Sequence, residues 1–124
     1  MSFVELSAYL YAAICVGVIV FQICLIAGAP WGRLTQGGRV DGALPVAGRV
    51  GAFISIFLLT AMAWAVLSAA NLAPAWPGWT SWTALGVQTL SAILNWITPS
   101  KPERMLWGPV TTLMLLLVAF VVLS

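Results

Sequence analysis

Four long apolar stretches dominate this chain and limit the folds that it can adopt. No acidic or basic residue lies inside any of them, and they cover residues 6–29, 50–70, 81–97 and 105–124. About 20 apolar residues in a helix are needed to cross the hydrocarbon core of a bilayer. The third stretch is the shortest, and it reaches this length only if Pro77 opens its helix. The pattern therefore predicts four membrane-spanning helices.

The composition leads to the same class of protein. Hydrophobic residues make up 62% of the chain and charged residues only 6%, whereas a soluble domain has about a quarter charged residues. We therefore expect an all-α, polytopic membrane protein, a four-transmembrane-helix bundle that forms a single transmembrane domain over residues 1–124. The helices are predicted at about 5–28, 46–70, 78–97 and 101–123.

The charges predict how such a bundle is oriented. All five basic residues lie in the first and third connections, namely Arg33, Arg39, Arg49, Lys101 and Arg104. Short loops rich in Lys and Arg stay on the cytoplasmic side, so both termini are expected on the non-cytoplasmic side of a cell inner membrane. The start, MSFVELS, lacks the basic segment of a signal peptide, so the first helix is expected to be retained.

The first connection contains the unusual segment GAPWGRLTQGGRVDG, residues 28–42. Gly28 can end a helix in the left-handed conformation, and Pro30 prevents its continuation. Its arginines either serve only to orient the protein or bind an anion such as a lipid headgroup together with glycine amides. The candidate anion residues are Arg33, Arg39, Arg49 and Arg104. No strand precedes the segment and its spacing fits no nucleotide-binding motif, and the charges form no nucleic-acid footprint.

The third connection, NWITPSKPERMLWGP, predicts a helix start. Ser100 and Glu103 have the spacing of a capping box, and Pro109 should kink the helix that follows. Glu103 and Asp41 are the only acids in the two basic connections. We expect one of them to pair with an arginine and clamp the loops together, with Asp41, Glu103 and Ser100 as the clamp residues.

The two basic connections also carry a resemblance. The patterns GAPWG…GGR…LP…R and S-x-x-E-R-x-x-W-G-P resemble a family of small four-helix bacterial inner-membrane proteins of unknown function. The resemblance covers most of the chain, and it implies architecture and candidate positions but no activity. The matching positions are Gly28, Pro30, Trp31, Gly32, Gly38, Arg49, Asn95, Ser100, Glu103 and Arg104.

Polar residues inside the predicted spans gather on two faces. Gln88, Ser91 and Asn95 are spaced by three and four and share one helix face, and Tyr11, Cys15 and Gln22 share another. Because unpaired amides are costly in lipid, we expect the first face to point inward, toward Gln22 or Ser55. It either forms hydrogen bonds between helices or lines a polar cavity for a small neutral ligand.

Some functions are disfavoured by what the chain lacks. It has no histidine, the commonest ligand of haem, zinc and copper and the usual general base. Cys15 and Cys24 face opposite sides of one helix and cannot form a disulfide. We therefore expect no catalytic residues, no metal site and no cofactor.

These observations favour a non-enzymatic accessory, scaffolding or assembly subunit that acts by helix–helix packing in the bilayer. It would form a homo-oligomer or join a larger membrane complex. The alternative is a small-solute or lipid transporter or channel that uses the polar face of the helix at 78–97. A third possibility is an enzyme that acts on lipid headgroups through Glu103 and the arginines.

Overall fold

The computed structural model describes the whole chain, residues 1–124. It is all-helical, as the sequence predicts. Its elements are α1 (Phe3–Ile26), η1 (Gly32–Leu34), η2 (Gln36–Gly38), α2 (Val46–Ala69), α3 (Gly78–Ile97) and α4 (Lys101–Leu123), where η1 and η2 are single 3₁₀ turns in the first loop.

Three of the four long helices, α1, α2 and α4, are long and apolar enough to cross a membrane. The shorter α3 carries several threonines, serines and amides, which lower its hydropathy. Many large apolar side chains on the outer faces are exposed, among them Phe53 and Phe57 of α2 and Leu116 of α4. Such a surface is unusual for a soluble monomer and suits a chain that sits in lipid.

Local chemistry places the helix ends. Ser2 and Glu5 form a full capping box at the start of α1. Gly28, at φ 102°, follows the end of α1 in the left-handed region that glycine tolerates. Pro45 and Pro77 precede α2 and α3 directly, and the Ser100 hydroxyl caps α4. Helix limits in this chain thus follow from residues that cannot continue a helix or that satisfy its free N–H groups.

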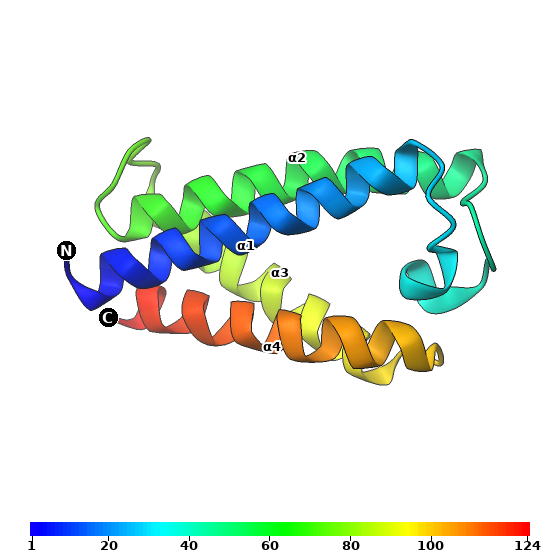
Figure 1. Ribbon diagram of the computed structural model, residues 1–124. Coiled ribbons are helices and arrows are strands. Elements are labelled where there is room, and N and C mark those ends of the chain that lie inside the picture. The colour runs from blue at the N-terminus through cyan, green and yellow to red at the C-terminus, as the bar shows by residue number, and fades with distance from the viewer.

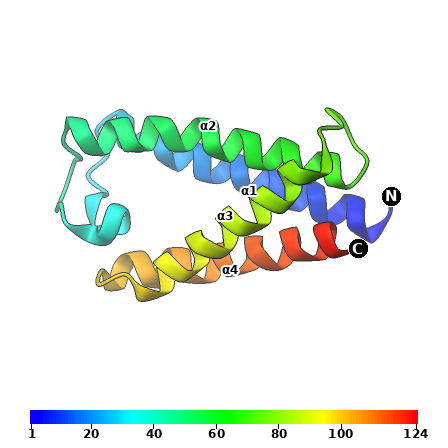
Figure 2. The same cartoon turned by 180° about the vertical axis from the view of Figure 1, so that it is seen from behind.

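The helices pack as two antiparallel pairs, α1 with α2 and α3 with α4. Both termini lie at one end of the bundle, where the pairs come together (Figure 1). Toward the other end the pairs separate, and the first loop, residues 27–45, lies between them there. The view from behind shows α3 crossing from α2 near the termini to α4 near the loop (Figure 2).

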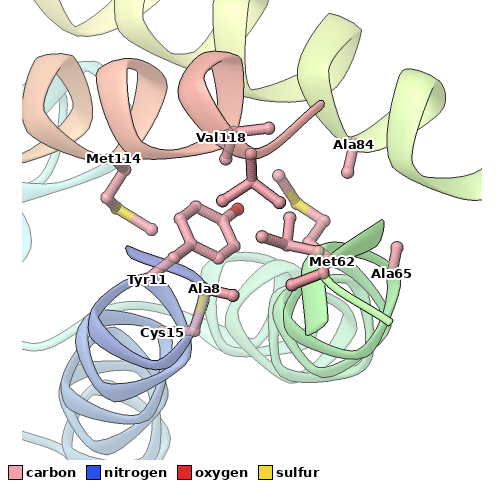
Figure 3. Close-up of a cluster of buried hydrophobic side chains, with 11 residues drawn as sticks. Ala8, Tyr11, Cys15, Met62, Ala65, Ala84, Met114 and Val118 are labelled. Carbon is pink, nitrogen blue, oxygen red and sulfur yellow. The ribbon is translucent and has the colours of Figure 1, made fainter. Parts of the chain in front are cut away.

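The main core fills the end where the pairs meet. Tyr11 and Cys15 of α1 face Met62 of α2 and Met114 and Val118 of α4 (Figure 3). Small side chains at Ala8, Ala65 and Ala84 let the backbones approach closely. A second, smaller cluster joins Leu44 of the first loop to Leu25 of α1 and Ala52 of α2. The two packed clusters therefore leave a space between the helix pairs toward the loop end.

Candidate ligand cavity

A cavity of about 570 Å³ lies in this space, within the range of roughly 300–1,000 Å³ that ligand pockets occupy. All four long helices and the first loop contribute to its walls. Apolar residues such as Phe21, Leu59 and Met114 line it beside a set of polar ones. The uncharged polar residues include Gln22, Ser55, Gln88, Ser91 and Asn95, and the charged ones are Arg39 and Glu103.

Gln88 closes the cavity on the side of the main core. Its Oε1 accepts a hydrogen bond of 2.9 Å from the Tyr11 hydroxyl, and its Nε2 donates to the Thr111 carbonyl at 3.3 Å. The side chain is only 2% exposed. Gln88 thus points inward, and its partners are Tyr11 and Thr111 instead of the expected Gln22 or Ser55. It joins three helices by hydrogen bonds.

Tyr11→Phe and Gln88→Leu are expected to be energetically coupled, because each alone leaves the other's buried polar group without its partner. We expect a coupling free energy of about 0.6–1.7 kcal/mol, the span of average and maximum values for such bonds in membranes. The double variant should therefore be more stable than the sum of the single losses implies. Thermal unfolding in detergent, with Tyr9→Phe on the exposed face of α1 as control, measures this. Strictly additive losses would contradict the hydrogen bond.

Gln22, Ser91 and Asn95 lie closer to the loop. Asn95 Nδ2 donates to the carbonyl and hydroxyl oxygens of Ser91, one turn earlier on α3. The Asn95 Oδ1 atom and the Gln22 amide make no hydrogen bond within the protein. Every fully buried side-chain polar atom has a partner, so these unpaired atoms are not fully buried, and both residues line the cavity. These two amides are therefore open to the cavity, where they can bind a ligand group or water.

The start of α4 holds the first loop over the end of the cavity. Glu103 Oε2 accepts from the backbone N–H of Gly37 at 3.1 Å, and the Ser100 hydroxyl donates to the Arg33 carbonyl at 2.6 Å. Trp107 Nε1 donates to the Leu34 carbonyl at 2.8 Å. We call these three contacts the loop clamp. They bind α4 to the backbone of η1 and η2.

The composition of the loop clamp differs from the expected one in three ways. The partner of Glu103 is a backbone N–H group and not an arginine. Asp41 is exposed and makes no clamp contact. Trp107, which is not among the expected clamp residues, is a third member. Its place in the WGP motif, one turn after Glu103, was the available signal, because residues four apart share a helix face.

The four candidate anion residues do not form one common site. Arg49 donates to the carbonyls of Leu44 and Ile26, and Arg104 donates to the Thr98 carbonyl. Arg33 is exposed. Arg39 alone among the four lines the cavity. Two of the four arginines therefore hold backbone carbonyls, and Arg39, which is itself exposed, adds a positive group to a cavity lining that also includes Glu103.

Comparison of the sequence with models of protein families, with curated proteins and with solved structures finds no match. The resemblance to small four-helix bacterial membrane proteins stays a prediction.

Proposed function

We propose that this chain is a four-spanning protein of a bacterial inner membrane that binds a small solute or lipid in the cavity. The observation that carries the proposal is the cavity itself, with open amides at Gln22 and Asn95 and with Arg39 and Glu103 at its loop end. A few polar groups in a mostly apolar wall are typical of ligand sites.

The membrane arrangement in this proposal counts α3 as the fourth span. Its buried residues include Ser81 and Gln88, whereas Trp82, Leu90 and Ile93 are exposed. A span with its polar groups turned inward keeps them out of lipid. The basic residues then lie at the cytoplasmic side and both termini at the other side.

A subunit that acts only by packing fits the cavity less well. Protein interiors are filled as densely as organic crystals, and a purely structural bundle gains stability by closing such a space. Here the first loop lies between the separated ends of the helix pairs, and the loop clamp bonds it to α4. The hydrogen bonds of the loop clamp thus fix the loop beside the cavity, which supports a binding role.

Filling the cavity should strongly reduce ligand retention. Ser91 lies on the cavity wall, so Ser91→Phe places a ring where the ligand would sit. Because the ligand no longer fits, the amount retained should fall by about tenfold or more. The protein is purified in mild detergent, and the bound small molecules and lipids are identified by mass spectrometry.

The matched control is Leu90→Phe, which adds a ring at the neighbouring exposed position of α3. It should retain as much bound material as the unmodified protein. Equal retention by Ser91→Phe and Leu90→Phe, or no bound molecule in the unmodified protein, would contradict the proposal.

A further inference from the structure

The cavity continues along one particular seam between helices. A second space of about 180 Å³ lies between α2 and α3 nearer the termini, and its walls are almost wholly apolar, with Trp76 and Trp79 at its far end. Both spaces share Leu58, Met62 and Val87. The two spaces therefore adjoin along the seam of α2 and α3, and we call them together the groove, with a polar chamber at the loop end and an apolar extension nearer the termini.

The sides of the polar chamber differ in how they are closed. Between α1 and α4, Phe21 and Trp107 meet edge to face with their ring centroids 4.8 Å apart. On the side of α2 and α3, the wall residues Leu58 of α2 and Leu94 and Ile97 of α3 are 46%, 51% and 69% exposed. The loop end is covered by η1 and η2 through the loop clamp. The chamber is thus open sideways, toward the lipid that surrounds a membrane-spanning bundle.

The loop end of the chamber offers one group of each charge. Glu103 is 5% exposed, and its Oε2 is taken by Gly37 while its Oε1 accepts no hydrogen bond. Every fully buried side-chain polar atom has a hydrogen-bond partner, so the unpaired Oε1 is not fully buried. Glu103 lines the chamber, and Oε1 is therefore open to it. It can accept from an ammonium or a hydroxyl group. Arg39, which is exposed and also lines the chamber, can bind a phosphate.

We propose that this groove binds one phospholipid from the leaflet at the loop side. An acyl chain lies along α2 and α3, the phosphate meets Arg39, and an ammonium or hydroxyl of the headgroup donates to Glu103 Oε1. The proposal rests on the proposed function and specifies its ligand. Ethanolamine and glycerol headgroups carry the required donor, and a choline headgroup carries none.

The test is a competition among lipids with identical chains. Delipidated protein is mixed with equal amounts of phosphatidylethanolamine, phosphatidylglycerol and phosphatidylcholine, and bound lipid is measured by native mass spectrometry. One lipid should bind per chain, with the first two favoured over phosphatidylcholine by about tenfold, the worth of one charge-assisted hydrogen bond.

Three variants and one control separate the parts of the site. Glu103→Gln keeps an acceptor for Gly37 and should lose the preference among headgroups. Arg39→Gln should weaken all three lipids. Leu94→Trp obstructs the groove and should displace lipid, whereas Ile93→Trp, at an exposed neighbour outside both spaces, should not.

The outcomes distinguish this proposal from the broader one. Water-soluble glycerophosphoethanolamine that binds as well as the intact lipid would overturn the lipid proposal and leave a ligand cavity in place. Equal lipid occupancy in Leu94→Trp and Ile93→Trp would place the lipid on the outer surface and overturn the groove. An undiminished headgroup preference in Glu103→Gln would overturn the role of Glu103. Absence of any bound molecule would overturn both proposals.

Discussion

Gly32→Ala is expected to destabilise the protein by about 1–3 kcal/mol or more, the usual cost of forcing atoms into filled space. Gly32 is buried in the first loop, and its N–H donates to the Gly42 carbonyl at 2.8 Å. A methyl group on Gly32 would lie 2.6 Å from that same carbonyl oxygen and closer still to the Val40 carbonyl. Both neighbours are backbone, so neither can rotate away. Thermal unfolding in detergent, followed by circular dichroism, measures the loss.

Two other glycines serve as controls for this prediction. Gly17, on the exposed face of α1, has no atom within 4 Å of an added methyl, so Gly17→Ala should cause no loss of stability, since alanine is the better helix former. Gly37 has φ 80° but only ordinary contacts, so Gly37→Ala should cost about 1–2 kcal/mol from left-handed backbone strain alone. If Gly32→Ala unfolds at the same temperature as Gly17→Ala, the close packing of the first loop is wrong.

The sequence predicted the helices well because their limits depend on neighbouring residues only. Pro45 and Pro77 mark the starts of α2 and α3, and Ser100 marks that of α4. Such signals act over one turn and need no knowledge of the fold. For α3 the pattern of apolar residues was weaker, and its hydropathy does not reach that of the other three helices. The inward direction of Gln88 could still be predicted, since an amide avoids lipid.

The partners across the bundle could not be predicted from local patterns. Gln88 reaches Tyr11 because α3 crosses between the helix pairs near the termini, and this crossing depends on how all four helices pack. The cavity has the same origin, because its volume depends on how far the pairs separate at the loop end. No spacing along a single helix encodes that separation.

The first loop shows a further limit of reasoning from charge alone. Attraction between opposite charges suggested an arginine as the partner of Glu103. The 3₁₀ turn η2 instead presents the Gly37 N–H to this carboxylate, and Arg49 and Arg104 satisfy carbonyls at loop and helix ends. Backbone groups without a hydrogen-bond partner are costly near a bilayer. The long arginine side chains, which can reach several carbonyls, therefore bond to these groups.

Glu103→Ala is expected to have the second large effect, a loss of about 1.5–3 kcal/mol, the range for a hydrogen bond to a charged group. The variant removes the contact with Gly37 and weakens the hold of α4 on η2. Glu103→Gln keeps an acceptor for Gly37 and should lose less. Thermal unfolding in detergent gives the order of the variants.

Glu5 is a matched control for Glu103, since both are the third residue of a helix capped by serine. The interaction of the charge with the helix dipole is therefore similar at both sites. Glu5 bonds only to Ser2, at an exposed helix end, where a cap is worth about 1 kcal/mol. Glu103→Gln should consequently destabilise the protein more than Glu5→Gln. Equal small effects at the two sites would mean that Glu103 is solvated and that the loop clamp depends on Ser100 and Trp107, in which case Trp107→Phe should become the most damaging change at the start of α4.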